Sequence, residues 1–471
     1  MKMLRFAVVL GLIVFASAHG VSAQALSDAQ RDAVVAWLEQ DAAERNAPAG
    51  LDLPQGLSAE ASAEMLDALW SIYRETVKDP ELIALPPTMA ELAKQAEDGR
   101  LQIRASVLTL GEHKMPYAVI RREKQPINAG DRPLFICTHG GGARPSVESA
   151  HAWNVNAREW QTQVRFAIQH YPEDGVYFVP RMADDRLGRW WHRHNHDAFE
   201  RVIEHAIAQW GVDPNRVYKV GISEGGYGTD ILAPFMPDRF AGANAMAAGV
   251  DQSNPPENLR NLAFRTDVGE KDTMFDRVTL AKAFHQTLDE LHKADPTGYT
   301  HSINVQPGRG HGIDYRPGVT WIAKHKRNAW PSRLTWLGKS LHDRRRDRHY
   351  WIQIEGDLGT DAVKIDTTAD RETNTITIDA KRQTIEGDGG NPTHAKVGSV
   401  KNSEPLKGVT LRVLLHDELL DLDQPIKVIV NGETLHDGKV TRNTTPQLRT
   451  MSRYGDPAMT ASAELVFALG K

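Results

Sequence analysis

The chain has 471 residues, a formal net charge of −5, 25% charged residues and 41% hydrophobic residues. This length exceeds one ordinary hydrophobic core and predicts two or three domains. The small net charge and ordinary apolar content are typical of a soluble globular protein and argue against a nucleic-acid partner. The basic run Arg344-Arg345-Arg346 alternates with Asp343 and Asp347, so we expect a solvated, self-paired surface segment rather than a phosphate-binding patch.

Residues 1–23 have the pattern of a signal peptide. A basic start at residues 1–5 precedes an apolar run, residues 6–16, that is too short to span a bilayer. Val21-Ser22-Ala23 forms a small-x-small cleavage pattern before Gln24. We therefore predict a secreted or periplasmic mature chain, without a membrane-spanning helix.

Residues 24–100 predict a helical N-terminal segment. Ser27 and Gln30 have the spacing of a capping box, and Met65, Leu69 and Tyr73 recur at helical spacing in a second element. We expect these helices to pack on the flank of the following domain, and a lid or substrate-binding cap is the alternative.

Residues 101–330 predict a catalytic domain of the α/β class. Longer amphipathic or polar stretches separate strand-like runs at 134–138, 176–179, 217–220, 243–247, 262–268 and 302–306. Such alternation is typical of a doubly wound, mostly parallel sheet flanked by helices.

A nucleophile elbow is predicted where one of these runs ends in Gly221-Ile222-Ser223-Glu224-Gly225. A serine is an efficient nucleophile only if its Oγ stands clear of the backbone, and a sharp strand-to-helix turn places it there. The same turn directs the first amides of the helix, beginning with Glu224 N–H, at a developing oxyanion. Ser223 is therefore the predicted nucleophile, and Glu224 N–H is one predicted oxyanion donor.

The glycine-rich loop His139-Gly140-Gly141-Gly142 follows the apolar strand 133–138. Its bare backbone can bring an N–H within reach of an oxyanion, and we assign this role to Gly141 and Gly142. A flexible glycine turn without catalytic role is the alternative. We also predict that His139 contacts the substrate.

An acid and a histidine follow Ser223 in the chain order that this strand-turn-helix architecture uses. Asp272 lies in a loop after the strand 262–268 and is the predicted acid. Its competitors are Glu270, Asp267 and Asp276. His311 stands between two glycines after the strand 302–306, and it is the predicted general base.

With these motifs, residues from about 101 to 330 resemble the α/β-hydrolase superfamily and look most like its secreted bacterial esterase branch. That branch includes acetylxylan and feruloyl esterases and depolymerase-like enzymes, and it lies near the prolyl-oligopeptidase peptidases. The resemblance rests on the glycine loop, on residues 213–218 running into the elbow, and on residues 269–272 and 310–312. It implies the α/β-hydrolase fold and favours ester over peptide hydrolysis.

One loop after the strand near Val179 is predicted to contact the substrate, because such insertions border the active-site mouth in this fold. It contains Arg189-Trp190-Trp191-His192, followed by His194 and His196. We predict an aromatic and cationic rim in which Trp190, Trp191 and His192 bind a polar or carboxylate-bearing substrate. A purely structural loop and a three-histidine metal site are the alternatives. We expect neither a metal nor a cofactor, since a serine mechanism needs none.

Residues 331–471 predict an all-β, sandwich-like C-terminal domain. Residues 375–378 alternate, residues 408–415 are strand-like, and residues 426–430 followed by Asn431-Gly432 predict a hairpin with a primed turn. The domain has no recognisable catalytic arrangement. We expect residues 24 to about 330 to fold and to hydrolyse a small ester without it.

Together these features predict a serine hydrolase, most consistently a carboxylic ester hydrolase with an acyl-enzyme on Ser223. The expected substrate is a small-molecule or polymer-linked ester, including a carbohydrate ester. The alternatives are a serine peptidase of prolyl-oligopeptidase type and a non-catalytic carbohydrate-binding protein on a hydrolase scaffold.

Overall fold

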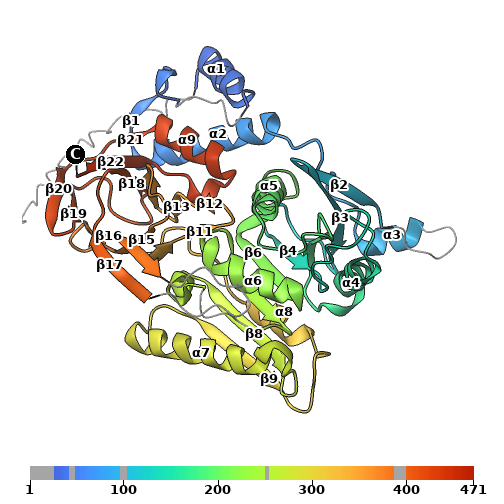
Figure 1. Ribbon diagram of the computed structural model, residues 1–471. Coiled ribbons are helices and arrows are strands. Elements are labelled where there is room, and N and C mark those ends of the chain that lie inside the picture. Colours follow the sequence, from blue (N-terminus) through green and yellow to red (C-terminus); the bar gives the residue numbers. More distant parts are fainter. Residues whose placement is uncertain (1–25, 42–47, 96–102, 250–253, 387–398, 471) are drawn as a thin grey trace, which may run out of the picture.

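The computed structural model describes residues 26–41, 48–95, 103–249, 254–386 and 399–470 (Figure 1). The predicted signal peptide and its cleavage point lie outside these residues. Within the described part of the chain, no helix has the length and apolar content needed to cross a membrane.

An eight-stranded sheet with the strand order β2-β3-β5-β4-β6-β7-β8-β9 forms the centre of the predicted catalytic domain. Its strands are β2 (Ala105–Leu110), β3 (His113–Arg122), β4 (Arg132–Thr138), β5 (Gly175–Pro180), β6 (Val212–Ile222), β7 (Gly242–Met246), β8 (Ala263–Gly269) and β9 (His301–Gln306). Strands β4 to β9 pair in parallel, whereas β2 and β3 are antiparallel additions at one edge. The predicted mostly parallel α/β sheet is confirmed.

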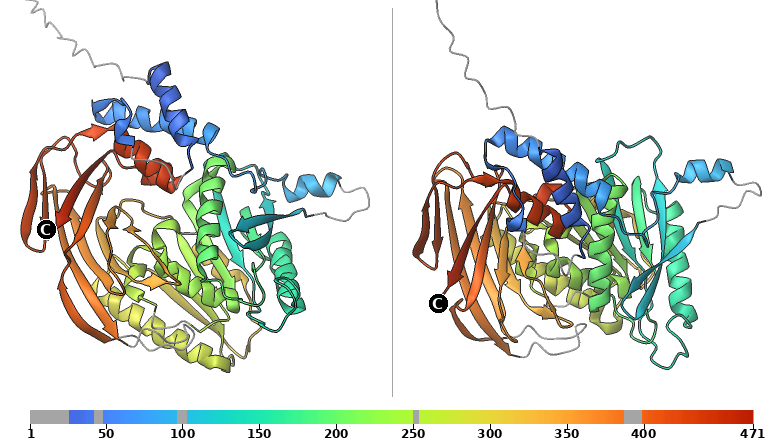
Figure 2. Two further views of the ribbon diagram at one scale, coloured as in Figure 1. Left: turned by 45° about the horizontal axis from the view of Figure 1, so that its top comes forward. Right: turned by 90° about the horizontal axis from the view of Figure 1, so that it is seen from above.

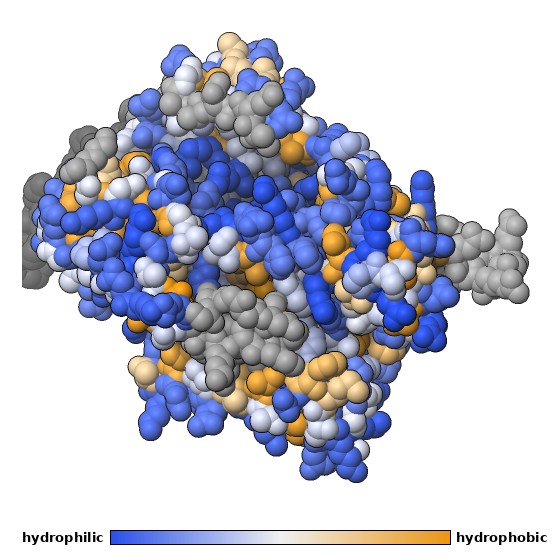
Figure 3. Space-filling view, in the orientation of Figure 1, coloured by the Kyte–Doolittle hydropathy of each residue, from blue (hydrophilic) through white to orange (hydrophobic). Residues whose placement is uncertain are grey.

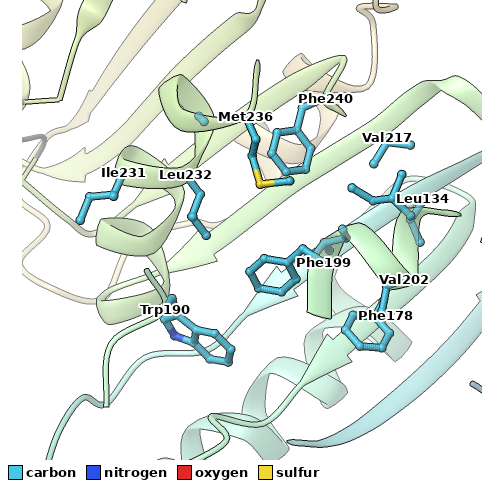
Figure 4. Close-up of a cluster of buried hydrophobic side chains, with 14 of the residues drawn as sticks. Leu134, Phe178, Trp190, Phe199, Val202, Val217, Ile231, Leu232, Met236 and Phe240 are labelled. Atoms are coloured by element: carbon cyan, nitrogen blue, oxygen red, sulfur yellow. The ribbon is translucent and has the colours of Figure 1, made fainter. Parts of the chain in front are cut away.

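Helices cover both faces of this sheet because the strand residues that point to each face are apolar. Leu134 and Ile136 of β4 share a core with α5 (Arg193–Gln209), α6 (Glu224–Phe235) and α7 (Arg277–Ala294). Phe135 and Cys137, which point the other way, share a second core with α4 (Asn154–Arg165) and α8 (Arg316–Ile322). Burial on both faces is what parallel sheets require. Part of the first core is drawn in Figure 4.

Two further sheets build the C-terminal region. One has the order β10-β15-β16-β19-β20 with β17 paired to β16, and the other has the order β13-β14-β18-β22. Their strands are β10 (Arg333–Gly338), β13 (Arg348–His349), β14 (Ile352–Glu355), β15 (Ala362–Asp370), β16 (Thr375–Glu386), β17 (Ser399–Pro405), β18 (Val409–Leu415), β19 (Ile426–Val430), β20 (Glu433–Gly438) and β22 (Ala463–Leu469). A single apolar core draws on both sheets, with Ile376 from one and Leu411 from the other. This shared core is typical of a sandwich.

Two local features of the C-terminal region bear on the sequence analysis. Asn431 and Gly432 have φ values of 51° and 85° between the antiparallel strands β19 and β20, which confirms the primed turn. The region is not wholly β, however, because α9 (Thr444–Tyr454) lies within it. A short hairpin, β11 (Ser340–Leu341) and β12 (Arg344–Arg345), lies between the sandwich strands β10 and β13.

The N-terminal segment packs against α9 of the C-terminal region. Helix α1 (Asp28–Leu38) begins at the predicted capping box, and α2 (Ala59–Thr76) is the second predicted helix. Their apolar residues, among them Val34 and Leu69, share a core with Leu448 and Met451 of α9. Strand β1 (Gln55–Leu57) pairs with β21 (Arg442–Asn443), and both views of Figure 2 show the N-terminal helices beside α9. Helix α2 also contacts α5, where Arg74 Nε donates to the Ala208 carbonyl at 2.8 Å. The segment therefore lies on the flank of the catalytic domain, as expected, and contacts α9 in addition.

Buried ion pairs join the C-terminal region to the catalytic domain. Arg346 donates to Glu200 of α5 and to Asp238, and its side chain is only 6% exposed. The expectation of a solvated basic run is therefore wrong for Arg346, because its carboxylate partners come from distant elements. Arg327 and Asp456 form a second buried pair, 2.8 Å apart. Removing one partner leaves a buried charge uncompensated. Contrary to the expectation from sequence, residues 24 to about 330 should therefore fail to fold without the C-terminal region.

Candidate active site

The turn between β6 and α6 holds Ser223 in a strained conformation, with φ 55° and ψ −115°. Both flanking glycines are needed for this turn. A Cβ on Gly221 would lie 1.8 Å from the carbonyl oxygen of Gly225, and a Cβ on Gly225 would lie 2.2 Å from that of Thr138. The close approach of these backbones therefore explains the Gly-x-Ser-x-Gly pattern, and the chain has the geometry of a nucleophile elbow.

The three predicted catalytic side chains meet at this turn. His311 Nε2 lies 3.0 Å from Ser223 Oγ, and His311 Nδ1 lies 2.8 Å from Asp272 Oδ2. The imidazole thus bridges a hydroxyl and a carboxylate, although the three residues come from segments far apart in the sequence. With Nδ1–H donated to Asp272, Nε2 is left to accept the serine proton. Asp272 is buried, whereas the His311 side chain is 47% exposed.

The other carboxylates considered for the acid have different partners. Asp267 is fully buried and forms two hydrogen bonds with Arg265, which makes it a structural residue of β8. Glu270 accepts the backbone N–H of Gly308 and thereby braces the loop that leads to His311. Asp276 stands at the N-cap of α7 in a left-handed conformation. Of these four carboxylates, Asp272 is the one that contacts His311.

Arg277 is a site residue that the sequence analysis missed. Its Nη1 donates to Asp272 Oδ1 at 2.9 Å, so the two oxygens of Asp272 have different partners. Arg277 also donates to the Tyr227 hydroxyl, and its guanidinium lies 5.0 Å from the centroid of the exposed Phe275 ring. No local pattern singles out an arginine at the start of a helix as the partner of a catalytic acid.

The glycine loop lies against Ser223, since a Cβ on Gly140 would be 3.2 Å from the Cβ of that serine. The assignment of Gly142 as an oxyanion donor needs correction. Its N–H already donates to Asn156 Oδ1 at 3.1 Å, and Asn156 Nδ2 donates back to the Gly142 carbonyl at 3.0 Å. Gly141 N–H and Glu224 N–H remain as candidates, the latter because first-turn amides of a helix have no intrahelical partner.

His139 supports the loop rather than lining its surface. Its ring is 1% exposed, Nε2 accepts the N–H of Met182, and Nδ1 lies 2.5 Å from the Gly140 carbonyl oxygen. Burial lowers the pKa of His139 to about 4, so the ring is neutral at physiological pH. The prediction that this side chain contacts the substrate is therefore corrected.

Trp190 and Trp191 are buried, with exposed fractions of 0% and 2%. The indole N–H of Trp190 donates to the His139 carbonyl at 3.0 Å, and its ring points into the core with Phe199 and Leu232 (Figure 4). Neither indole offers a face for stacking on a substrate. The prediction that these indoles form a substrate-binding rim is therefore wrong. They are part of a structural loop, because α5 and α6 pack over it.

Two of the three histidines of this loop lie together, and the third lies apart from them. His192 and His194 are half-buried and stack at 5.8 Å, and His192 also packs against His342 of the C-terminal region. His196 is buried elsewhere, with Nε2 at 2.8 Å from the Trp191 carbonyl oxygen. Burial lowers the pKa of His192 to about 4. Among the described residues, no group of three His, Cys, Asp or Glu side chains has the arrangement of a metal site.

Arg189 is the part of the predicted rim that reaches solvent. Its side chain is 37% exposed, and Nη1 donates to Glu224 Oε2 at 2.8 Å, directly beside the nucleophile. The guanidinium also lies 5.6 Å from the Trp191 ring centroid. Burial raises the pKa of Glu224, and Arg189 opposes that shift. An ion pair therefore lies next to the elbow.

Comparison with known proteins gives limited sequence similarity. No family model matches the chain. A poly(3-hydroxyalkanoate) depolymerase C from Paucimonas lemoignei is 26% identical over 128 residues, which is 26% of this chain and 29% of that protein. The similarity thus spans less than a third of the relative's length.

The fold can be assigned from the strand order of the sheet and from the turn at Ser223. The chain has the α/β-hydrolase fold. Similar solved structures include a thermostable esterase, at 20% identity and a TM-score of 0.36, covering 48% of this chain and 63% of that one. A poly(3-hydroxybutyrate) depolymerase from Bordetella parapertussis is 15% identical with a TM-score of 0.34, covering 50% of this chain and 92% of that one. At these values the likeness transfers no substrate to this chain.

Proposed function

We propose that this protein is a serine esterase that hydrolyses carboxylic esters through an acyl-enzyme on Ser223. The observation that carries the proposal is the pair of contacts at His311, one to Ser223 Oγ and one to the buried Asp272. A strained, glycine-flanked serine with a base and an acid in line is the arrangement that nucleophilic acyl transfer requires.

In the proposed reaction His311 Nε2 takes the Ser223 proton as Oγ attacks the ester carbonyl carbon. The carbonyl oxygen becomes negatively charged and accepts hydrogen bonds from Glu224 N–H and Gly141 N–H, each expected to contribute about 3–4 kcal/mol. Collapse of this intermediate expels the alcohol, which leaves with the proton from His311. Water, activated by His311, then attacks the acyl carbon and releases the acid.

The substrate side of the proposal rests on the surroundings of the elbow. The partly exposed Arg189 pairs with Glu224 beside Ser223, and Met274 and Phe275 are 64% and 54% exposed just after the Asp272 loop. An ester with an apolar portion and a polar portion suits these surroundings. Secretion, supported by the signal-peptide pattern of residues 1–23, would bring the enzyme to small or polymer-linked esters outside the cytoplasm.

The test is turnover of p-nitrophenyl acetate by the mature chain, together with covalent labelling by a fluorophosphonate probe. Ser223→Ala should lower kcat/KM by about 10³-fold or more and abolish labelling, with an unchanged melting temperature. Ser149→Ala, an exposed serine, is the matched control. A Ser223→Ala enzyme that keeps over a tenth of wild-type turnover would refute the nucleophile. Cleavage of peptide p-nitroanilides but not esters would favour the peptidase alternative.

A further inference from the structure

A cleft of about 580 Å³ lies outside the catalytic triad, between α5, the segment 344–348 and α9. Seven arginines line it, four from that segment and three, Arg412, Arg449 and Arg453, from β18 and α9. Four carboxylates accompany them. Figure 3 shows a strongly hydrophilic surface in the upper central part of the view, where these elements meet. The volume is that of a small-molecule site, for which about 300–1,000 Å³ is usual.

The floor of the cleft is rigid. Arg346 and Arg348 are each 6% exposed and both contact Glu200 and Asp238. The Arg348 guanidinium also lies 3.7 Å from the centroid of the Tyr454 ring. These contacts hold two guanidinium groups in fixed positions between the two domains, which reduces the entropy lost when they bind a ligand.

The cleft has more hydrogen-bond donors than its own carboxylates satisfy. Each guanidinium has five N–H donors. Arg345 donates to the carbonyl oxygens of Gly338 and Gly359, and no carboxylate of the described residues lies within 4.0 Å of it. Arg345 is therefore the arginine of this cleft whose guanidinium is free of a carboxylate partner among the described residues.

One of the four carboxylates is only partly ionised near neutral pH. Burial raises the pKa of Glu204, on α5, to about 7, and the neighbouring Glu200 acts in the same direction while Arg239 opposes it. The lining carboxylates therefore carry less than four negative charges, while carboxylates outside the lining, such as Asp238 and Glu464, also pair with its arginines.

We propose that this cleft binds a small multivalent oxyanion, a molecule with two or more carboxylate, phosphate or sulfate groups, between the arginines of segment 344–348 and those of β18 and α9. Planar guanidinium groups form paired hydrogen bonds with such groups, and charge-assisted bonds are the strong ones. Ion pairs that only joined the two domains would leave neither an open cleft between them nor an arginine, such as Arg345, without a carboxylate partner in the described part of the chain. No residue of the proposed triad lines the cleft, so the inference does not depend on the proposed esterase activity.

The test is calorimetric titration of the full mature chain, at low ionic strength, with citrate, pyrophosphate, a disulfated disaccharide and, as the monovalent control, acetate. We expect one multivalent anion to bind at least about tenfold more tightly than acetate, as additional charge-assisted contacts imply. The anion that binds most tightly identifies whether the site selects carboxylate, phosphate or sulfate groups.

Substitutions of single arginines test whether the anion binds in this cleft. Arg345→Gln and Arg453→Gln should each weaken association about tenfold or more, because each removes charge-assisted hydrogen bonds. Arg158→Gln, an exposed arginine of α4, is the matched control and should bind like wild type within about twofold. If Arg345→Gln fails to fold, Arg453→Gln, whose side chain is 46% exposed, gives the same comparison. Absence of binding by every multivalent anion, or equal weakening in the control, would overturn the proposal.

Discussion

Replacing Trp190 with alanine should destabilise the whole catalytic domain rather than change substrate preference. The indole is fully buried, and its packing is tight enough that a Cβ on Gly228 would lie 2.4 Å from the Trp190 Cβ. Loss of such a side chain costs about 3–5 kcal/mol. The His139 carbonyl would also lose its hydrogen bond at 3.0 Å, which adds about 1 kcal/mol.

This sum of about 4–6 kcal/mol is a large part of the 5–15 kcal/mol that stabilises a typical domain. At about 2–4 °C per kcal/mol for a domain of this size, the melting temperature should fall by roughly 10–20 °C. Thermal denaturation followed by circular dichroism measures the shift, and turnover of p-nitrophenyl acetate and of a sugar or hydroxycinnamoyl ester measures selectivity. At a temperature where the variant is folded, its losses on small and large esters should be similar.

The matched control is Leu187→Ala, three residues earlier in the same loop, because Leu187 is 44% exposed and its truncation opens no cavity. Its melting temperature should stay within about 2 °C of wild type. Trp190→Ala with an unchanged melting temperature, and a loss confined to large substrates, would refute the structural assignment. Such a result would mean that the indole is a binding surface after all.

Four other variants test three separate parts of the structure. Asp272→Asn should lower kcat by about 10³-fold or more, whereas Asp276→Asn should lower it less than about threefold; a reversed order would reassign the acid. A chain ending at residue 330 should be insoluble or unfolded, because it leaves buried charges such as Arg327 without their partners; a soluble, active fragment would show that the domains are separable. Burial lowers the pKa of Lys219 to about 7, so the folded state binds fewer protons than the unfolded state between about pH 7 and 10. Stability should therefore rise with pH across this window, and Lys219→Met should gain more in melting temperature at pH 6.5 than at pH 9; an equal gain at both values would contradict the burial effect.

The elbow and the residues after β8 and β9 could be predicted because each is a local motif attached to the end of an apolar strand. Parallel strands bring those ends to one edge of the sheet, so the chain order alone indicated that Ser223, Asp272 and His311 meet. The residues that hold the site in place have no comparable motif in the sequence. Asn156 reaches Gly142 from a neighbouring helix, and a lone asparagine in a polar helix is indistinguishable from a surface residue.

Side-chain direction and long-range pairing account for the errors. The position of the loop containing Trp190 followed from the strand before it, but the burial of the indole depends on α5 and α6, which pack over it. Similarly, Arg346 pairs with Asp238, which is 108 residues away in the sequence. The local charge pattern includes only the neighbouring Asp343 and Asp347. Helix α9 begins at Thr444 with threonine and proline, which are poor indicators of a helix interior.

The pairing of β1 with β21 affects the order in which this chain completes its fold during synthesis. Thr444 donates to the carbonyl of Pro54 across 390 residues of sequence. At ribosomal rates of about 5–20 residues per second, the partner of Pro54 is made roughly 20–80 s after it. During that interval the apolar residues of α1 and α2, such as Val34 and Leu69, have no α9 to cover them. Helices α1 and α2 can therefore complete their shared core only after α9 is made, and slowed translation or early arrest should leave that apolar face open to proteases and chaperones.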